Sequence, residues 1–188
     1  MIFGKKMVEI YHDVMKDVIR PGDTVVDATA GNGHDTEFLC GLVGEGGCVH
    51  AFDIQQQAIE HTKQRLLSQG LYSQARLHLA SHDQVDEYVE GEISGFCFNL
   101  GYLPEGDKVV ITNVSTTLPA VKKCLDALKT GGVGCILAYY GHDGGREEME
   151  NVDELLQHLP SKKYEVFRLE NHNRAHQPPI LYLIRKLR

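Results

Sequence analysis

A glycine-containing segment that follows an apolar run is the first place where residue types and spacing could do chemistry. Residues 27–33 read Asp-Ala-Thr-Ala-Gly-Asn-Gly and follow the run Thr-Val-Val. In an α/β fold, such a loop between a strand and a helix forms a ligand site, because glycine lets the backbone approach a ligand and the helix N-terminus presents free N–H donors. A dinucleotide loop requires G-x-G-x-x-G, but the third glycine is absent after Gly31 and Gly33. The segment therefore disfavours a dehydrogenase, and a tight turn without a ligand stays open.

The same loop fits the pattern of S-adenosylmethionine-dependent methyltransferases, which is acidic-x-Gly-x-Gly-x-Gly. Asp27, Gly31 and Gly33 are in register with that pattern, and Thr29 replaces its first glycine. Asp53 ends the next apolar run, where a carboxylate can accept hydrogen bonds from both ribose hydroxyls. The predicted cofactor is therefore S-adenosylmethionine, although Asp53 alone would serve NAD equally well.

Two further segments fall where an adenosine group would lie. Gln55 comes just after Asp53 and could reach the ribose or the adenine. Ser81-His82-Asp83 follows the third predicted strand, where this architecture supplies adenine contacts. Ser81 and Asp83 are also good helix N-caps, so a capping role is the alternative. The two roles are compatible.

The segment Asn99-Leu100-Gly101-Tyr102 has residue types that could bind an amine. Amino-group methyltransferases often end this strand in Asp/Asn-Pro-Pro-Tyr, where the amide or carboxylate oxygen aims the amine's lone pair and the ring stacks on the target base. Asn99 and Tyr102 keep that spacing, while Leu100 and Gly101 replace the prolines. Since methyl transfer is an in-line displacement, positioning and desolvation supply most of the catalysis. We predict catalytic roles for Asn99 and Tyr102, and a buried strand end is the alternative.

His142 is the third candidate catalytic residue. It follows the fifth predicted strand, whose carboxyl end lies at the same edge of the sheet as the cofactor. With an unperturbed pKa of about 6.5, a histidine there could remove a proton from an ammonium substrate. A glycine-rich turn with an exposed histidine is the alternative. Methylation at a pyrimidine ring carbon generally needs a cysteine nucleophile. Cys97 lies inside a predicted strand and Cys124 on a predicted helix, so neither is well placed for that role.

The polar segment Asn171–Pro179 is a candidate contact with RNA. His172, Asn173 and Arg174 suit phosphate groups or base edges, although a solvated hairpin loop would have the same composition. The net charge of -7 is unevenly spread, since residues 160–188 carry seven Lys/Arg against two Glu. This asymmetry can mark an anionic partner at one end of the molecule, or the charges can decorate solvated strands.

Length and composition favour one soluble globular domain over residues 1–188, with 42% hydrophobic and 24% charged residues. No apolar run reaches the roughly 18 residues that span a bilayer, and the N-terminus lacks a signal-peptide core. Five scattered cysteines without a CxxC pair favour free thiols and no metal site. We therefore expect a cytoplasmic protein without a membrane partner.

Apolar runs and helical periodicities alternate along the chain. Strands are predicted at 24–28, 48–54, 75–80, 95–100 and 134–140, helices at 7–19, 36–42, 56–68, 118–128 and 147–159, and final strands at 164–169 and 180–184. The alternation implies parallel βαβ units, and the last two strands imply an antiparallel hairpin. The predicted fold is α/β: a single Rossmann-like class I methyltransferase domain, with a mainly parallel seven-stranded sheet and a C-terminal antiparallel hairpin.

Taken in order, these segments resemble the rRNA methylase family typified by YtqB, including tRNA methyltransferases of the MnmM type. The matching strings are VVDATAGNGHDTEFL, FDIQ, SHD, FNLGYLPEGDK, YYGHDGGREE and NHNRAHQPP. The resemblance covers nearly the whole chain. It implies a class I methyltransferase fold with cofactor contacts at Asn32, Asp35, Asp53, Gln55, Ser81 and His82.

The resemblance also implies a substrate. It points to tRNA rather than rRNA, and to methylation of the exocyclic amine of 5-aminomethyl-(2-thio)uridine at the wobble position. The implied partner is thus the tRNA anticodon stem-loop, and a homodimer stays open. The N-terminal segment, with acidic Glu9, departs from the family pattern, so the role of the first helix is undefined. A small-molecule amine methyltransferase, an rRNA methyltransferase and a nucleotide-sensing module remain as alternatives.

Overall fold

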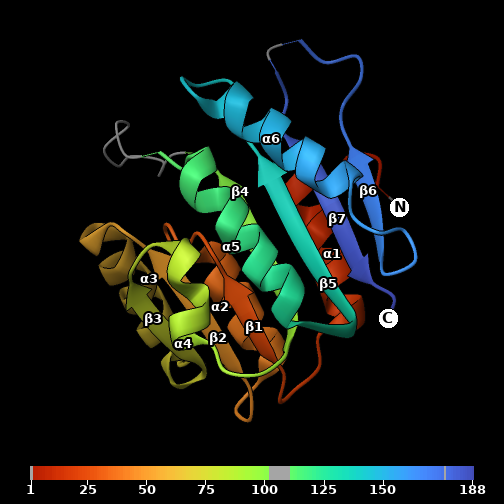
Figure 1. Cartoon of the computed structure of the whole chain (residues 1–188). Helices are drawn as coiled ribbons and strands as arrows, with labels where there is room; N and C mark the ends of the chain where they lie inside the picture. Colours follow the sequence, from red (N-terminus) through yellow and green to blue (C-terminus); the bar gives the residue numbers. More distant parts are fainter. Residues whose placement is uncertain (1, 102–110, 176) are drawn as a thin grey trace.

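A computed structural model describes residues 2–101, 111–175 and 177–188 (Figure 1). Their strands form one seven-stranded sheet in the order β3-β2-β1-β4-β5-β7-β6. The strands are β1 (Thr24–Asp27), β2 (Cys48–Asp53), β3 (Ala75–Leu79), β4 (Ile93–Leu100), β5 (Leu128–Ala138), β6 (Tyr164–Leu169) and β7 (Ile180–Lys186). The first five are parallel, and β7 lies antiparallel between β5 and β6. The predicted parallel sheet with a C-terminal antiparallel hairpin is confirmed.

Helices cover both faces of this sheet (Figure 1). They are α1 (Met7–Val18), α2 (His34–Val43), α3 (Gln56–Gln69), α4 (Val85–Tyr88), α5 (Val114–Ala127) and α6 (Gly145–Gln157), with short 3-10 turns η1 (Tyr72–Gln74) and η2 (His82–Gln84). Helices α1 to α3 lie on one face, and α4 to α6 lie on the other. Because each central strand is buried on both faces, its sequence is a continuous apolar run.

Alternate residues of each strand enter different cores. Val25 and Cys97 belong to the core beneath α1 and α2, whereas Val26, Phe96 and Phe98 belong to the core beneath α5 and α6. This period of two fixes which face the last residue of each strand occupies. Asp27 lies two residues after Val25 and therefore points toward α1 to α3. By the same alternation, Asp53 of β2 and Asn99, the second-last residue of β4, lie on that face.

The predicted bounds of the fifth helix and of the fifth strand are wrong. Helix α5 begins at Val114 and not at residue 118, because the Asn113 side chain caps it by accepting a hydrogen bond from the Ser115 backbone N–H at 3.1 Å. The same helix ends at Ala127, one residue before its predicted end, and β5 starts at once at Leu128 and not at residue 134. The glycines at 131–132 lie inside β5, near a register shift in its pairing with β4. The four-residue helix α4 was missed because it is too short to show a periodicity.

The sheet brings the predicted chemistry to one edge. Asp27, Asp53 and Asn99 lie at the carboxyl ends of β1, β2 and β4, which are neighbours in the sheet. The order of the strands reverses between β1 and β4, and ligands of such sheets bind in the crevice beyond that point. The fold therefore supplies a binding edge that faces α1 and α2.

Gly33 offers a test of how tightly this edge is built. Its φ is +79°, and an added Cβ would lie 2.8 Å from the Thr62 Cα. We expect Gly33→Ala to lower the free energy of unfolding by roughly 2–4 kcal/mol, since left-handed strain and overpacking add. Gly70→Ala is the matched control, because its φ is +68° but the described residues leave the Cβ in clear space. Urea denaturation that gives equal losses for both variants would contradict this account.

Candidate active site

Asp27 is buried and supports the glycine-containing segment at residues 27–33, here called the glycine loop. Its carboxylate accepts hydrogen bonds from the Thr36 hydroxyl of α2 at 2.6 Å and from the Thr29 backbone N–H at 3.2 Å. Burial raises the pKa of Asp27 to about 7, and the nearby charge of Asp35 adds to the rise. Both carboxylate oxygens thus hold the loop against α2. A direct contact between Asp27 and a cofactor stays a prediction.

Asp53 joins the end of β2 to the same loop. Its carboxylate accepts the Gln55 backbone N–H at 2.9 Å and the Gly31 backbone N–H at 3.0 Å. Burial raises its pKa, and these two bonds act in the opposite direction. Each carboxylate oxygen can accept more than one hydrogen bond, so ribose hydroxyls can still be bound. The adjacent Ile54, which the sequence analysis did not single out, is 57% exposed and offers an apolar surface beside the carboxylate. These residues fit an adenosine group.

Helix α3 holds the middle of the glycine loop. The Asn32 carbonyl accepts a hydrogen bond from Arg65 Nε at 2.8 Å, and its side-chain Oδ1 lies 3.3 Å from His61 Nδ1. Arg65 also pairs with Glu37 of α2 at 2.9 Å. The loop therefore has a fixed shape, and the predicted cofactor contact at Asn32 stays a prediction.

His82 packs beneath the loop. It is buried, with Nδ1 3.2 Å from the Ala28 carbonyl and Nε2 3.3 Å from the Thr116 hydroxyl. Burial lowers its pKa, so the ring is neutral and Nδ1–H donates to the carbonyl. Ser81 stands at the N-cap of η2, but its side chain makes no capping bond, so the capping alternative is wrong for this side chain. The adenine contacts predicted for Ser81 and His82 remain predictions.

Asn99 lies at the centre of a polar cluster on the α1–α3 face. Its side-chain Nδ2 donates to the Asp35 carboxylate and, at 3.1 Å, to the Tyr11 hydroxyl. Its backbone N–H donates to the Thr29 hydroxyl at 2.7 Å. The threonine that replaces the first glycine of the cofactor pattern thus connects the loop to β4. Sequence reasoning named Asn99 and Asp35 but missed Tyr11 and the use of Thr29.

Asp35 has a second partner in this cluster. Its other carboxylate oxygen lies 2.6 Å from His12 Nε2. The His12 ring stacks on Phe38 with centroids 3.7 Å apart and planes 8° from parallel. One residue of α2 therefore links α1 to the end of β4. The cofactor contact that the family resemblance implies for Asp35 is a prediction beside these contacts.

Of the other two candidate catalytic residues, only His142 is among the residues that the structure describes. Tyr102 falls outside the described residues. His142 lies beside the backbone that follows β4, since a Cβ added to Gly101 would be 3.7 Å from His142 Nε2. Its Nδ1 is 3.0 Å from the Asp143 carbonyl. His142 thus lies beside Gly101, which is two residues beyond Asn99 along the chain, and its role as a proton acceptor stays a prediction.

A buried carboxylate that was not predicted from the sequence lies near the end of β4. Glu148 is 2% exposed and accepts hydrogen bonds from the hydroxyls of Thr112 at 2.7 Å and Thr117 at 2.6 Å. Burial raises its pKa. Thr112 also accepts the Gly101 backbone N–H at 2.9 Å, so Glu148 supports the end of β4. Within the described parts of the chain, no group of three or more potential ligands could hold a metal ion.

The C-terminal polar segment reaches the same edge of the sheet. Ala138 of β5 pairs with Ile180 of β7, so the loop before β7 lies next to the loop after β5. A hollow of about 280 Å³ lies between them, lined by Tyr140, Glu170, Asn171, His172, Arg174, Gln177 and Pro178. His172, Asn173 and Arg174 are all exposed. Among the other C-terminal cations, Arg168 pairs with Asp153 at 3.2 Å.

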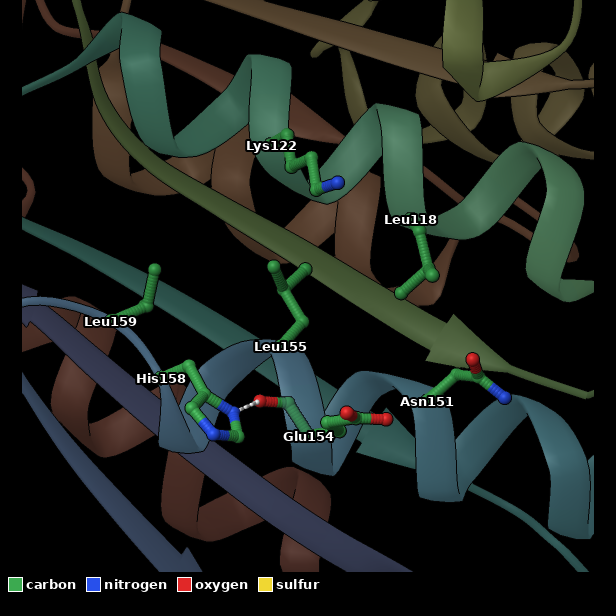
Figure 2. A pocket seen from close by; sticks show the side chains of 7 residues that line it. All are labelled: Leu118, Lys122, Asn151, Glu154, Leu155, His158 and Leu159. Atoms are coloured by element: carbon green, nitrogen blue, oxygen red, sulfur yellow. Dashed lines mark hydrogen bonds between the residues drawn. The ribbon is translucent and has the colours of Figure 1, made fainter.

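A second hollow, of about 330 Å³, lies between α5 and α6 (Figure 2). Leu118 and Lys122 of α5 face Leu155 across it, and His158 Nδ1 lies 2.7 Å from the Glu154 carbonyl. None of the predicted site residues lines this hollow. The predicted site residues that the structure describes therefore lie away from this hollow, and their chemical roles stay predictions.

Comparisons with solved structures agree with this fold. A protein of Clostridium thermocellum described as a putative rRNA methylase superposes with a TM-score of 0.95, at 43% identity, covering 97% of this chain and 98% of that one. A putative methyltransferase of Streptococcus mutans, solved in complex with SAH, gives 0.90 at 37% identity, covering 97% and 99%. An O-methyltransferase of Thermotoga maritima, at 19% identity and a TM-score of 0.64, shares the fold alone. The fold is that of the class I methyltransferases.

Sequence comparison then gives the family. Residues 49–185 match the family model described as "Putative rRNA methylase". A chloroplastic tRNA (mnm(5)s(2)U34)-methyltransferase of Arabidopsis thaliana is 39% identical over 197 residues, which cover 98% of this chain and 72% of that protein. The chain therefore belongs to the rRNA methylase family, as its motifs predicted. No helix within the described residues has the length and apolarity needed to cross a bilayer.

The buried Asp27 predicts a pH dependence of stability. Because its pKa is higher in the folded protein than in the unfolded chain, the folded state holds the extra proton between about pH 4 and pH 7, and stability falls as pH rises through that window. We expect the stability of the wild type relative to Asp27→Asn to fall by roughly 2–4 kcal/mol between pH 4 and pH 8.

Denaturant unfolding at four pH values checks this expectation. Asp13→Asn is the control, because its exposed carboxylate accepts a hydrogen bond from Lys5 that lowers its pKa. Its difference from the wild type should be flat above pH 5. A flat difference for Asp27→Asn as well would show that Asp27 is ionised throughout.

Proposed function

We propose that this protein transfers a methyl group from S-adenosylmethionine to the exocyclic amine of 5-aminomethyl-(2-thio)uridine at the wobble position of tRNA. The observation that carries the proposal is the orientation of Asn99. Its amide nitrogen is committed to Asp35 and Tyr11 at the end of β4, which leaves its oxygen to accept a hydrogen bond from an amine. The Arabidopsis relative is described as a methyltransferase for the same tRNA position.

The glycine loop and the end of β2 form the proposed cofactor site. When bound there, S-adenosylmethionine supplies the electrophilic methyl group. Asp53 would accept the ribose hydroxyls, and Ile54 would cover one side of the adenine. The backbone around Gly31 and Gly33 would pass close to the ligand because no side chain intervenes. The relative from Streptococcus mutans was solved with SAH, which supports this assignment.

Asn99 would act by positioning. Its Oδ1 would accept one hydrogen of the substrate amine, so that the nitrogen lone pair points along the line of methyl transfer. Holding the two reacting groups in line is the main source of rate in such a displacement. Tyr102 is proposed to stack on the target base, which a single-stranded anticodon loop can present.

The proton of the amine has to leave before attack. An alkylamine is mostly in its protonated ammonium form at pH 7, so the rate should rise toward alkaline pH as the free amine forms. We propose His142 as the proton acceptor. Its position beside the Gly101 backbone, two residues past Asn99, supports this role.

The tRNA itself is proposed to bind over the hollow between the loops after β5 and before β7. The lining combines a cation, Arg174, with an aromatic ring, Tyr140, and a histidine, His172. This set suits a phosphate and a neighbouring base. It lies at the same sheet edge as Asn99, so one RNA loop could reach both. Asn173 is exposed next to it and is proposed as a further contact.

Two matched tRNAs test the proposed reaction, one with the aminomethyl group on its wobble uridine and one with plain uridine. We expect methyl transfer only to the first, because only that tRNA carries the amine. Asn99→Ala should lower the single-turnover rate by roughly 100-fold with little change in tRNA affinity, since the lost contact orients the amine. Equal methylation of both tRNAs would rule out the amine as the acceptor.

A salt titration tests the RNA surface. Arg174→Ala should weaken tRNA binding and reduce the slope of log affinity against log salt by about 1, the effect of losing one phosphate contact. Arg185→Ala is the matched control, because it removes the same charge from the C-terminal part of the chain. Arg185 lies in β7 opposite Val133, toward the other edge of the sheet. If both variants behaved like the wild type, the segment would be a solvated loop without RNA contacts.

A further inference from the structure

Helix α1 contributes two side chains to the cluster around Asn99, although its sequence pattern predicts no functional role. Tyr11 is 1% exposed, and its hydroxyl accepts a hydrogen bond from Asn99 Nδ2 at 3.1 Å. His12 follows it and lies 2.6 Å from the Asp35 carboxylate. The partners of the Asn99 side-chain amide thus come from α1 and α2, which pack on the same face of the sheet.

Hydrogen-bond chemistry fixes the orientation of the Asn99 amide. The carboxylate of Asp35 can only accept, so the amide atom that faces it has to be Nδ2. Nδ2 has two hydrogens, and Tyr11 accepts the second one. Both hydrogens of Asn99 Nδ2 are therefore donated, one to Asp35 and one to Tyr11. Turning the amide by 180° would set Oδ1 against the carboxylate and leave two acceptors facing each other.

The surroundings keep the Tyr11 hydroxyl protonated and the Asp35 carboxylate in place. Burial raises the pKa of the Tyr11 phenol far above its ordinary value, and Cys97 and Asp35 add to the rise. The hydroxyl is therefore neutral and can accept the amide hydrogen while its own proton points elsewhere. His12 is fixed by its stack on Phe38, and it holds the Asp35 carboxylate from the far side.

We propose that Tyr11 is a positioning residue for methyl transfer, which acts with the Asp35–His12 pair to hold the Asn99 amide with its oxygen toward the substrate amine. This inference rests on the proposed role of Asn99. Tyr11 does not touch the reacting atoms. It limits the amide to one orientation, so removing its hydroxyl should reduce the fraction of bound substrate that is correctly aimed.

A double-mutant cycle on the full-length protein tests this proposal. The rate of one turnover on aminomethyl-tRNA, at saturating S-adenosylmethionine, is measured for Tyr11→Phe, Asn99→Ala and the double variant. We expect Tyr11→Phe to lower the rate roughly 10-fold. It should change the dissociation constant of S-adenosylmethionine, measured by calorimetry, less than two-fold. In the Asn99→Ala background the same change should have no further effect, because there is no amide left to orient.

Tyr164→Phe is the matched control. Tyr164 is also buried, and its hydroxyl donates to the Leu125 carbonyl at 3.0 Å, but it begins β6 at the opposite edge of the sheet. Its rate should match the wild type. If loss of the Tyr11 hydroxyl unfolds the protein, His12 gives a second reading. His12→Ala should slow transfer, and His12→Gln, which keeps a donor toward Asp35, should restore part of the rate.

The outcomes distinguish a failure of the inference about Tyr11 from a failure of the proposed function. If Asn99→Ala is slow but Tyr11→Phe is as fast as the wild type, the positioning role of Tyr11 is wrong and the proposed function stands. If the two losses multiply in the double variant, Tyr11 acts independently of Asn99 and the inference is overturned. If Asn99→Ala itself transfers methyl at the normal rate, the proposed role of Asn99 fails first.

Discussion

The hydrogen bond between the Asp35 carboxylate and the Asn99 amide joins the two halves of the binding edge. Asp35 belongs to the helix that follows the glycine loop, and Asn99 lies near the carboxyl end of β4, the strand next to β1. The bond can form only because the strand order reverses between β1 and β4, which brings their carboxyl ends side by side. Thr29 repeats the link through the backbone N–H of Asn99. The loop that would hold a cofactor and the strand that would hold an amine are therefore one rigid unit.

This arrangement buries carboxyl groups, which lowers the free energy of unfolding. Asp27 and Asp35 both lie close behind the glycine loop, and burial disfavours the ionised form of Asp27. Hydroxyl and backbone donors from the same loop and helix offset part of that cost. Glu148 repeats the pattern beside β4, where two threonine hydroxyls hold a buried carboxylate. Stability is thus given up at the edge where the chemistry is proposed, as at many functional sites.

The sequence predicted the sheet, its antiparallel end and the residues at the strand ends, because local patterns encode them. Apolar runs fix the strands, and parallel strands bring Asp27, Asp53 and Asn99 to one edge by geometry alone. The contact between Tyr11 and Asn99 joins residues 88 positions apart and has no local signal. Helix α1 also precedes the recognisable motifs, so nothing nearby marked Tyr11 as functional. Roles in cofactor and RNA binding depend on ligands, which patterns of residues can only suggest.

The most direct test of the central claim is mass spectrometry of tRNA nucleosides from cells with and without this gene. Loss of the gene should remove the methylated 5-aminomethyl nucleoside of the wobble position and leave the unmethylated amine in its place. Restoring the gene should return the methyl group, and restoring it as Asn99→Ala should not. An unchanged tRNA profile, with a methyl group missing from rRNA instead, would contradict the account.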